Sequence, residues 1–74
     1  MTTQLSLPGV LATNEVGRLH AEREALRRRV GALLRQHNRL RARGDVEGAS
    51  AAWREANRYE DRARALSAQI REAA

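Results

Sequence analysis

The sequence contains no cysteine, no lysine and no phenylalanine, and it has only one tryptophan and one tyrosine. A chain without cysteine forms no disulfide and no cysteine-based zinc site. The scarcity of aromatic residues argues against recognition of single-stranded nucleic acid by base stacking. No apolar run approaches the roughly 20 residues of a membrane span, and the N-terminal segment carries no basic residue before Arg18, so it does not resemble a signal peptide. We therefore expect a cytoplasmic protein that does not enter a membrane.

The charge is positive overall but concentrated in one segment. The 74 residues carry a formal net charge of +5, and all 14 basic residues are arginine. Residues 25–44 hold seven arginines and no acidic residue, whereas the segments on either side are each close to neutral. A chain of this length is small for a self-sufficient hydrophobic core, so a partner or a second copy is expected.

Leucines recur at every seventh position in the first half of the chain, at Leu19, Leu26, Leu33 and Leu40. Seven residues make two helical turns, so these leucines line one stripe of a long helix. Thr13 or Asn14 is a suitable N-cap, and Gly44 followed by Asp45 is a typical helix end and restart. The pattern predicts helices at about residues 14–43 and 46–72, with residues 1–13 as an irregular N-terminal arm that has room for one helical turn around residues 8–12.

The second helix has a matching heptad made mostly of small residues. If the chain folds back at Gly44, residues whose numbers sum to 89 lie level with each other, and Leu33 then faces Ala56 while Leu26 faces Ala63. Large residues facing small ones allow two helices to approach closely. We call these positions the seam: Val16, Leu19, Arg23, Leu26, Val30, Leu33, His37 and Leu40 of the first helix, and Ala49, Ala52, Ala56, Tyr59, Ala63, Leu66, Ile70 and Ala73 of the second. The predicted fold is an all-α, antiparallel two-helix coiled-coil hairpin.

Two apolar residues fall beside the seam rather than in it. Leu34 and Trp53 share one edge of the predicted hairpin, with Val30 and Tyr59 behind them. A two-helix hairpin has no third layer to cover such an edge. We therefore predict a protein interface at Leu34, Trp53, Val30 and Tyr59, formed with a protein partner or with a second copy in a four-helix homodimer.

The arginine-rich segment suggests an alternative function. The arginines that would form a phosphate-binding surface are Arg27, Arg28, Arg29, Arg35, Arg39, Arg41 and Arg43. They are distributed around the helix instead of forming one stripe, and a composition that uses arginine in place of lysine offers a simpler origin for them. Contacts with nucleic acid would be mainly electrostatic contacts with its backbone.

Neither a catalytic site nor a metal site is predicted. His20, Glu24 and Ser67 come near one another on one edge, but two helices provide no enclosed pocket and no oxyanion donors for nucleophilic catalysis. His20 and His37 are separated by roughly 25 Å along one helix, so they cannot share an ion. The sequence therefore predicts a non-enzymatic interaction and assembly module, with no cofactor and no small-molecule substrate.

Overall fold

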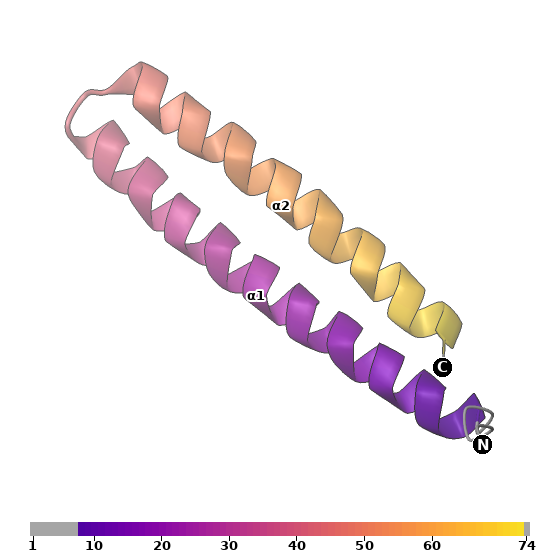
Figure 1. The fold of residues 1–74 in the computed structure, drawn as a ribbon. Coiled ribbons are helices and arrows are strands. Elements are labelled where there is room, and N and C mark those ends of the chain that lie inside the picture. The colour runs from indigo at the N-terminus through magenta and orange to yellow at the C-terminus, as the bar shows by residue number, and fades with distance from the viewer. Residues whose placement is uncertain (1–7, 74) are drawn as a thin grey trace.

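The computed structural model describes residues 8–73 as two long helices joined by a tight turn. Helix α1 spans Pro8–Ala42 and helix α2 spans Val46–Ala73. The two helices run antiparallel along their whole shared length, so the start of α1 and the end of α2 lie at the same end of the molecule (Figure 1). The predicted all-α helical hairpin is confirmed.

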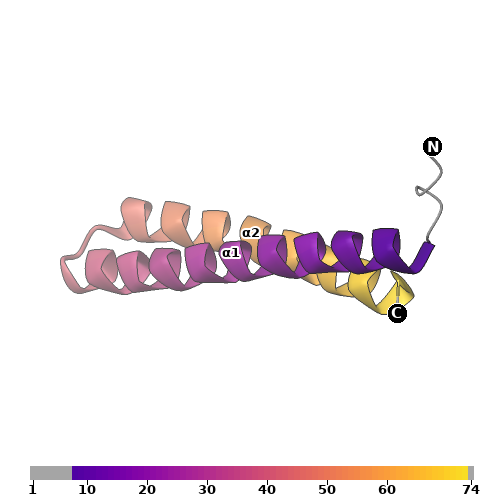
Figure 2. The same cartoon turned by 60° about the horizontal axis from the view of Figure 1, so that its bottom comes forward.

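The hairpin is a rod rather than a compact domain. Its principal extents are 62 × 19 × 13 Å, and its radius of gyration is 17.8 Å, compared with about 11 Å for a compact domain of this length. Seen from a second direction, α2 crosses α1, lying on one side of it near the turn and on the other side at the opposite end (Figure 2). Because two crossing helices cover only one face of each other, most of the surface of both remains in contact with solvent.

The turn uses the residues that the sequence assigned to it. Gly44 has a φ of 82°, a left-handed conformation in which a side chain would be strained. The amide of Asp45 donates to the carbonyl of Leu40 (2.9 Å) and the amide of Gly44 donates to that of Arg41 (3.0 Å), which is the hydrogen-bond pattern of a Schellman motif. The Asp45 carboxylate then accepts the amide hydrogen of Gly48 at 2.9 Å and caps α2.

The first helix starts earlier than the sequence suggested. It begins at Pro8, so Thr13 and Asn14 lie inside α1 and do not cap it, and residues 8–13 of the predicted arm are helical. Proline is well suited to the first position of a helix, where its fixed φ is helical and its missing amide hydrogen has no intrahelical acceptor. The prediction for residues 1–7 lies outside the described residues. The other helix ends agree with the prediction to within one residue.

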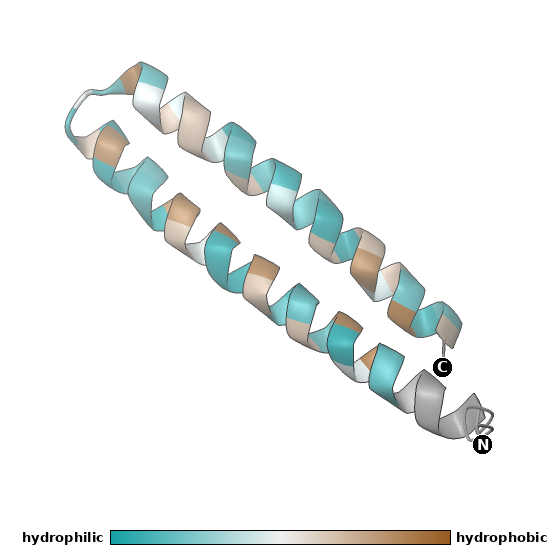
Figure 3. Ribbon diagram, in the orientation of Figure 1, coloured by the Kyte–Doolittle hydropathy of each residue, from teal (hydrophilic) through white to brown (hydrophobic). Residues whose placement is uncertain are grey.

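The core consists of a single layer between the helices. Among residues 14–73 six apolar side chains are buried, and all occupy seam positions: Leu26, Leu33, Ala49, Ala52, Ala56 and Ala63. Leu33 is 4% exposed and Ala56 is 2% exposed, as expected if the leucine packs directly over the alanine. The hydrophobic residues of α1 accordingly line the side that faces α2 (Figure 3).

The register agrees with the one predicted from the two heptads. The side chains of His37 and Trp53 meet across the seam, and so do those of Arg23 and Ser67. The residue numbers of each pair add to 90, one more than the predicted 89. A shift by a whole heptad would have changed the sum of the paired residue numbers by seven. The leucines of α1 therefore face the small residues of α2, as predicted.

Candidate interaction surface

One edge of the hairpin carries the most exposed large apolar side chains of residues 14–73. We call it the tryptophan edge; it consists of His20, Arg27, Leu34 and Arg41 from α1 and of Val46, Trp53, Glu60 and Ser67 from α2. Val46 is 73% exposed and Trp53 is 48% exposed. They are seven residues apart on α2, so they lie on the same face of the helix about 10 Å from each other. Leu34 is half-buried beside them.

Trp53 is held against α1 by a histidine of the seam. The rings of Trp53 and His37 are 5.4 Å apart at an angle of 46°, within the range of favourable aromatic contacts. Nδ1 of His37 lies 2.8 Å from the carbonyl oxygen of Ala49. Since a carbonyl can only accept, Nδ1 carries a hydrogen and donates it. His37 therefore links α1 to α2 by a hydrogen bond and contacts the indole ring of Trp53, which is otherwise largely exposed.

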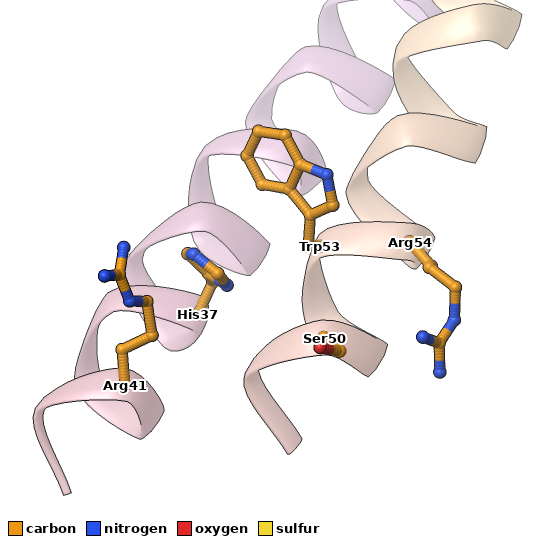
Figure 4. A pocket seen from close by; sticks show the side chains of 5 residues that line it. All are labelled: His37, Arg41, Ser50, Trp53 and Arg54. Carbon is orange, nitrogen blue, oxygen red and sulfur yellow. The ribbon is translucent and has the colours of Figure 1, made fainter. Parts of the chain in front are cut away.

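A groove of about 450 Å³ lies beside Trp53. It is lined by His37 and Arg41 of α1 and by Ser50, Trp53 and Arg54 of α2. Arg41 extends alongside His37, whereas the side chain of Arg54 points away from α1 (Figure 4). A second groove of about 320 Å³ shares three of these residues and continues to Val46 near the turn. The lining contains cationic, hydroxyl and aromatic groups but no carboxylate.

Two of the four predicted interface residues, Val30 and Tyr59, occupy seam positions behind this edge. The guanidinium of Arg29 lies 5.9 Å from the centre of the Tyr59 ring, and Arg29 also forms a long ion pair of 3.9 Å with Glu55. Tyr59 is a half-buried seam residue, and its ring lies next to Arg29. Val30 is half-buried within the seam. Leu34 and Trp53 thus remain as the predicted pair on the tryptophan edge.

The arginines proposed for nucleic-acid binding are all exposed: Arg27, Arg28, Arg29, Arg35, Arg39, Arg41 and Arg43. Their surroundings in the structure differ. Arg29 contacts Tyr59 and Glu55, Arg41 lines the groove, and Arg43 belongs to the turn because α1 ends at Ala42. Within residues 14–73, Arg28, Arg35 and Arg39 of the outer face take part in no ion pair.

The serine and histidine considered for catalysis are both bound by one arginine. Nη1 of Arg23 donates to the Ser67 hydroxyl at 3.1 Å, and Nη2 of Arg23 is 2.9 Å from Nδ1 of His20. A guanidinium only donates, so Nδ1 of His20 accepts. This arrangement gives the serine a cation as its neighbour and no base to remove its proton.

Searches for a metal site and a membrane-spanning helix in the described part of the chain, and for similar proteins, found none. Within the described residues no group of three or more histidine, aspartate or glutamate side chains is placed to hold a metal ion. Neither helix, over the part of the chain that is described, is long and apolar enough to cross a membrane. The chain matches no protein-family model, no curated protein and no solved structure.

Sequence reasoning overlooked three residues of this surface. Val46 is predicted only as the first residue of α2. It lies one heptad before Trp53, and this spacing could have placed it on the same edge. His37 is predicted only as a seam position, because its contact with Trp53 depends on the rotamers of both rings. Ser50, half-buried in the groove, has no sequence signal of its own.

Proposed function

We propose that this chain is a non-enzymatic helical hairpin that acts as an interaction and assembly module, associating with a second copy through the tryptophan edge. The observation that carries the proposal is the 48% exposure of Trp53 next to a groove, on the same face of α2 as the exposed Val46. A large, partly exposed aromatic side chain beside aliphatic residues is a common centre of binding energy in protein interfaces. A cytoplasmic location stays a prediction.

The limited core supports the same proposal. Between residues 14 and 73 only six apolar side chains are buried, and four of them are alanines that contribute little area each. A rod with one thin packing layer gains stability when a second hairpin covers an open edge and turns two helices into a four-helix bundle. Self-association would therefore stabilise the fold as well as form the assembly.

The proposal is tested by measuring molar mass and melting temperature over a range of protein concentrations. We expect the wild type to dimerise and to melt at a higher temperature as its concentration rises. The double variant Trp53→Ala with Leu34→Ser should raise the dissociation constant at least about 30-fold, the effect of losing one hot spot. Arg58→Ala, an exposed change on α2 away from this edge, is the matched control and should leave the dimer intact.

A wild type that remains monomeric at high micromolar concentration, with a melting temperature independent of concentration, would contradict self-association. The alternative function is nucleic-acid binding by the arginine-rich helix, for which the exposure and free charge of Arg28, Arg35 and Arg39 are the supporting observation.

A further inference from the structure

Two opposite charges lie at the same level of the tryptophan edge, on different helices. Arg27 lies seven residues before Leu34 on α1, and Glu60 lies seven residues after Trp53 on α2. Because the helices run antiparallel, both charges are displaced about 10 Å from this apolar pair towards the free end of the rod. The edge therefore has an apolar centre and, beside it, one basic and one acidic group.

A second pair of charges continues this layer with the signs exchanged. Glu24 precedes Arg27 by three residues, and Arg64 follows Glu60 by four, spacings that keep side chains on one side of a helix. Nε of Arg64 lies 3.5 Å from the Glu60 carboxylate, but the Arg64 side chain is 74% exposed, and such a pair contributes little. Over residues 14–73, neither Arg27 nor Glu24 forms an ion pair. These charges are thus open to groups outside the molecule.

We propose that a second copy of this chain docks on the tryptophan edge with the two turns at the same end, so that α1 of each copy lies on α2 of the other. This inference rests on the self-association proposed above and adds its orientation. The two copies are related by a two-fold axis parallel to the rod, between the two edges. Such an axis involves no shift along the rod, so each residue meets the second copy at its own level.

The residues that this axis brings together are complementary along the edge. The numbers of facing residues add to 87 or 88, within three of the 90 observed inside one copy, so they are level to within about 5 Å. Each pair occurs twice: Arg27 with Glu60, Glu24 with Arg64, Leu34 with Trp53, Arg41 with Val46, and Asn38 with Ser50. The exposed Val46 is covered by the aliphatic part of Arg41, and both ionic pairs join opposite charges.

The opposite orientation of the two rods is unfavourable by the same reasoning. A two-fold axis perpendicular to the rod, at the level of the apolar centre, would lay α1 on α1 and α2 on α2. Arg27 and Arg41 lie seven residues on either side of Leu34. This axis would therefore set Arg27 of each copy beside Arg41 of the other, which makes two like-charge contacts. Glu60 would lie near Val46 of the second copy and lose its basic partner.

The groove beside Trp53 fits the proposed orientation. In that dimer α2 of the second copy lies over α1, and its Trp53 is level with Leu34 and His37. The incoming indole then enters the groove of about 450 Å³ to which His37, Arg41 and Ser50 contribute. The guanidinium of Arg41 is a favourable neighbour for an aromatic ring. Both half-exposed tryptophans lose contact with water in this way, which favours association.

Reversing the charges of Arg27 and Glu60 tests this orientation, with dissociation constants measured by sedimentation equilibrium. Arg27→Glu alone and Glu60→Arg alone should each raise the dissociation constant of the homodimer at least about tenfold, because each creates two like-charge contacts. An equimolar mixture of the two variants should form a heterodimer within about threefold of the wild type. In this mixture the two groups still have like charges inside each copy, so the recovery reports contacts between copies.

Two exposed neighbouring positions provide matched controls. Arg28→Glu and Asp61→Arg change the net charge by the same amounts on α1 and α2, but these residues lie away from the tryptophan edge. Each should change the dissociation constant less than about threefold, and mixing them should produce no preference for a heterodimer.

A distance between labels measures the orientation directly. The chain has no cysteine, so Glu72→Cys provides one site for a spin label near the free end of α2. With the turns at the same end, the two labels are separated only by the width of the bundle, roughly 30 Å or less. The opposite orientation would place them roughly 50 Å apart. Pulsed electron paramagnetic resonance distinguishes these two distances.

The possible failures are distinguishable. Labels roughly 50 Å apart, or tighter dimerisation of Arg27→Glu, would overturn this orientation in favour of the opposite one, in which the new carboxylate faces Arg41. If the wild type dimerises but the mixture of single variants does not recover, this orientation is overturned and self-association stands. A wild type that stays monomeric overturns both this inference and the proposed self-association.

Discussion

Arg23 places a permanent charge at a seam position. It bonds to the neutral Ser67 and His20, has no carboxylate partner within the described residues, and leaves its buried Nε without a hydrogen-bond partner. A charged group held between two helices loses hydration that two neutral partners only partly replace. At the level of this residue the seam is thus weaker than the layers that contain leucine.

Replacing Arg23 by leucine should therefore stabilise the hairpin. The new side chain would face Leu66 and extend the apolar seam column of Val16 and Val30, and we expect the free energy of unfolding to rise by about 1 kcal/mol or more. Urea denaturation followed by circular dichroism at fixed protein concentration measures this change. Arg28→Leu, on the exposed outer face, is the control and should give no comparable gain. A loss of stability in Arg23→Leu would mean that the guanidinium has a stronger partner in solution.

The seam between the two helices was predictable because heptad spacing determines which residues of each helix face the other. Leu33 and Ala56 were assigned to one layer from their numbers, and both are buried in it. The turn was equally predictable, since the left-handed conformation at Gly44 and the cap at Asp45 follow from local chemistry.

Other elements and contacts could not be obtained from spacing. The start of α1 at Pro8 was missed because two residues with good capping side chains follow it, and a cap is only a local preference. The contact of the Tyr59 ring with Arg29 could not be obtained from spacing, because the direction in which a seam side chain leans depends on its rotamer and its neighbours. The groove depends on rotamers of His37 and Arg41, which the heptad does not determine.

The close packing of Leu33 on Ala56 leads to a prediction about the stability of the seam. Ala56→Leu should overpack it and lower the free energy of unfolding by about 1–3 kcal/mol. Ala51→Leu makes the same chemical change at an exposed position of α2 and should have little effect. Thermal denaturation of both variants provides the comparison. Stabilisation by Ala56→Leu would show that the helices are further apart at this layer than the structure indicates.

The outer face of α1 is the surface that distinguishes assembly from nucleic-acid binding for the molecule as a whole. Arg28, Arg35 and Arg39 span roughly 16 Å of this face, which the seam does not use. We expect their combined replacement by glutamine to leave the oligomeric state unchanged, and any binding of duplex DNA by the wild type to disappear by physiological salt, because purely electrostatic contacts are screened. Fluorescence anisotropy at increasing salt, together with molar mass, measures both.

Replacement of Arg58, Arg62 and Arg71 by glutamine removes the same charge from exposed positions of α2 and is the control. Tight, salt-resistant duplex binding that only the three α1 substitutions abolish would reverse the order of the two proposed functions.

The single turn at Gly44 also has a consequence for how the hairpin forms. Contacts near the turn join residues close in sequence, such as His37 and Ala49, 12 positions apart, whereas the contact of Arg23 with Ser67 spans 44 positions. Closing the longer loop first would cost about 1 kcal/mol more entropy than closing the shorter one. The buried side chains of residues 14–73, moreover, all lie between Leu26 and Ala63, on the turn side of that contact.

The contacts between the helices should consequently form first beside the turn during folding. During unfolding they should break first at the free end. Amide hydrogen exchange read by nuclear magnetic resonance should be slowest around Leu33 and Ala56 and progressively faster towards Val16 and Ile70. Faster exchange beside the turn than at the free end would contradict this order. If the order holds, partial opening of the rod separates its two free helix ends first and leaves the surface around Trp53 intact until last.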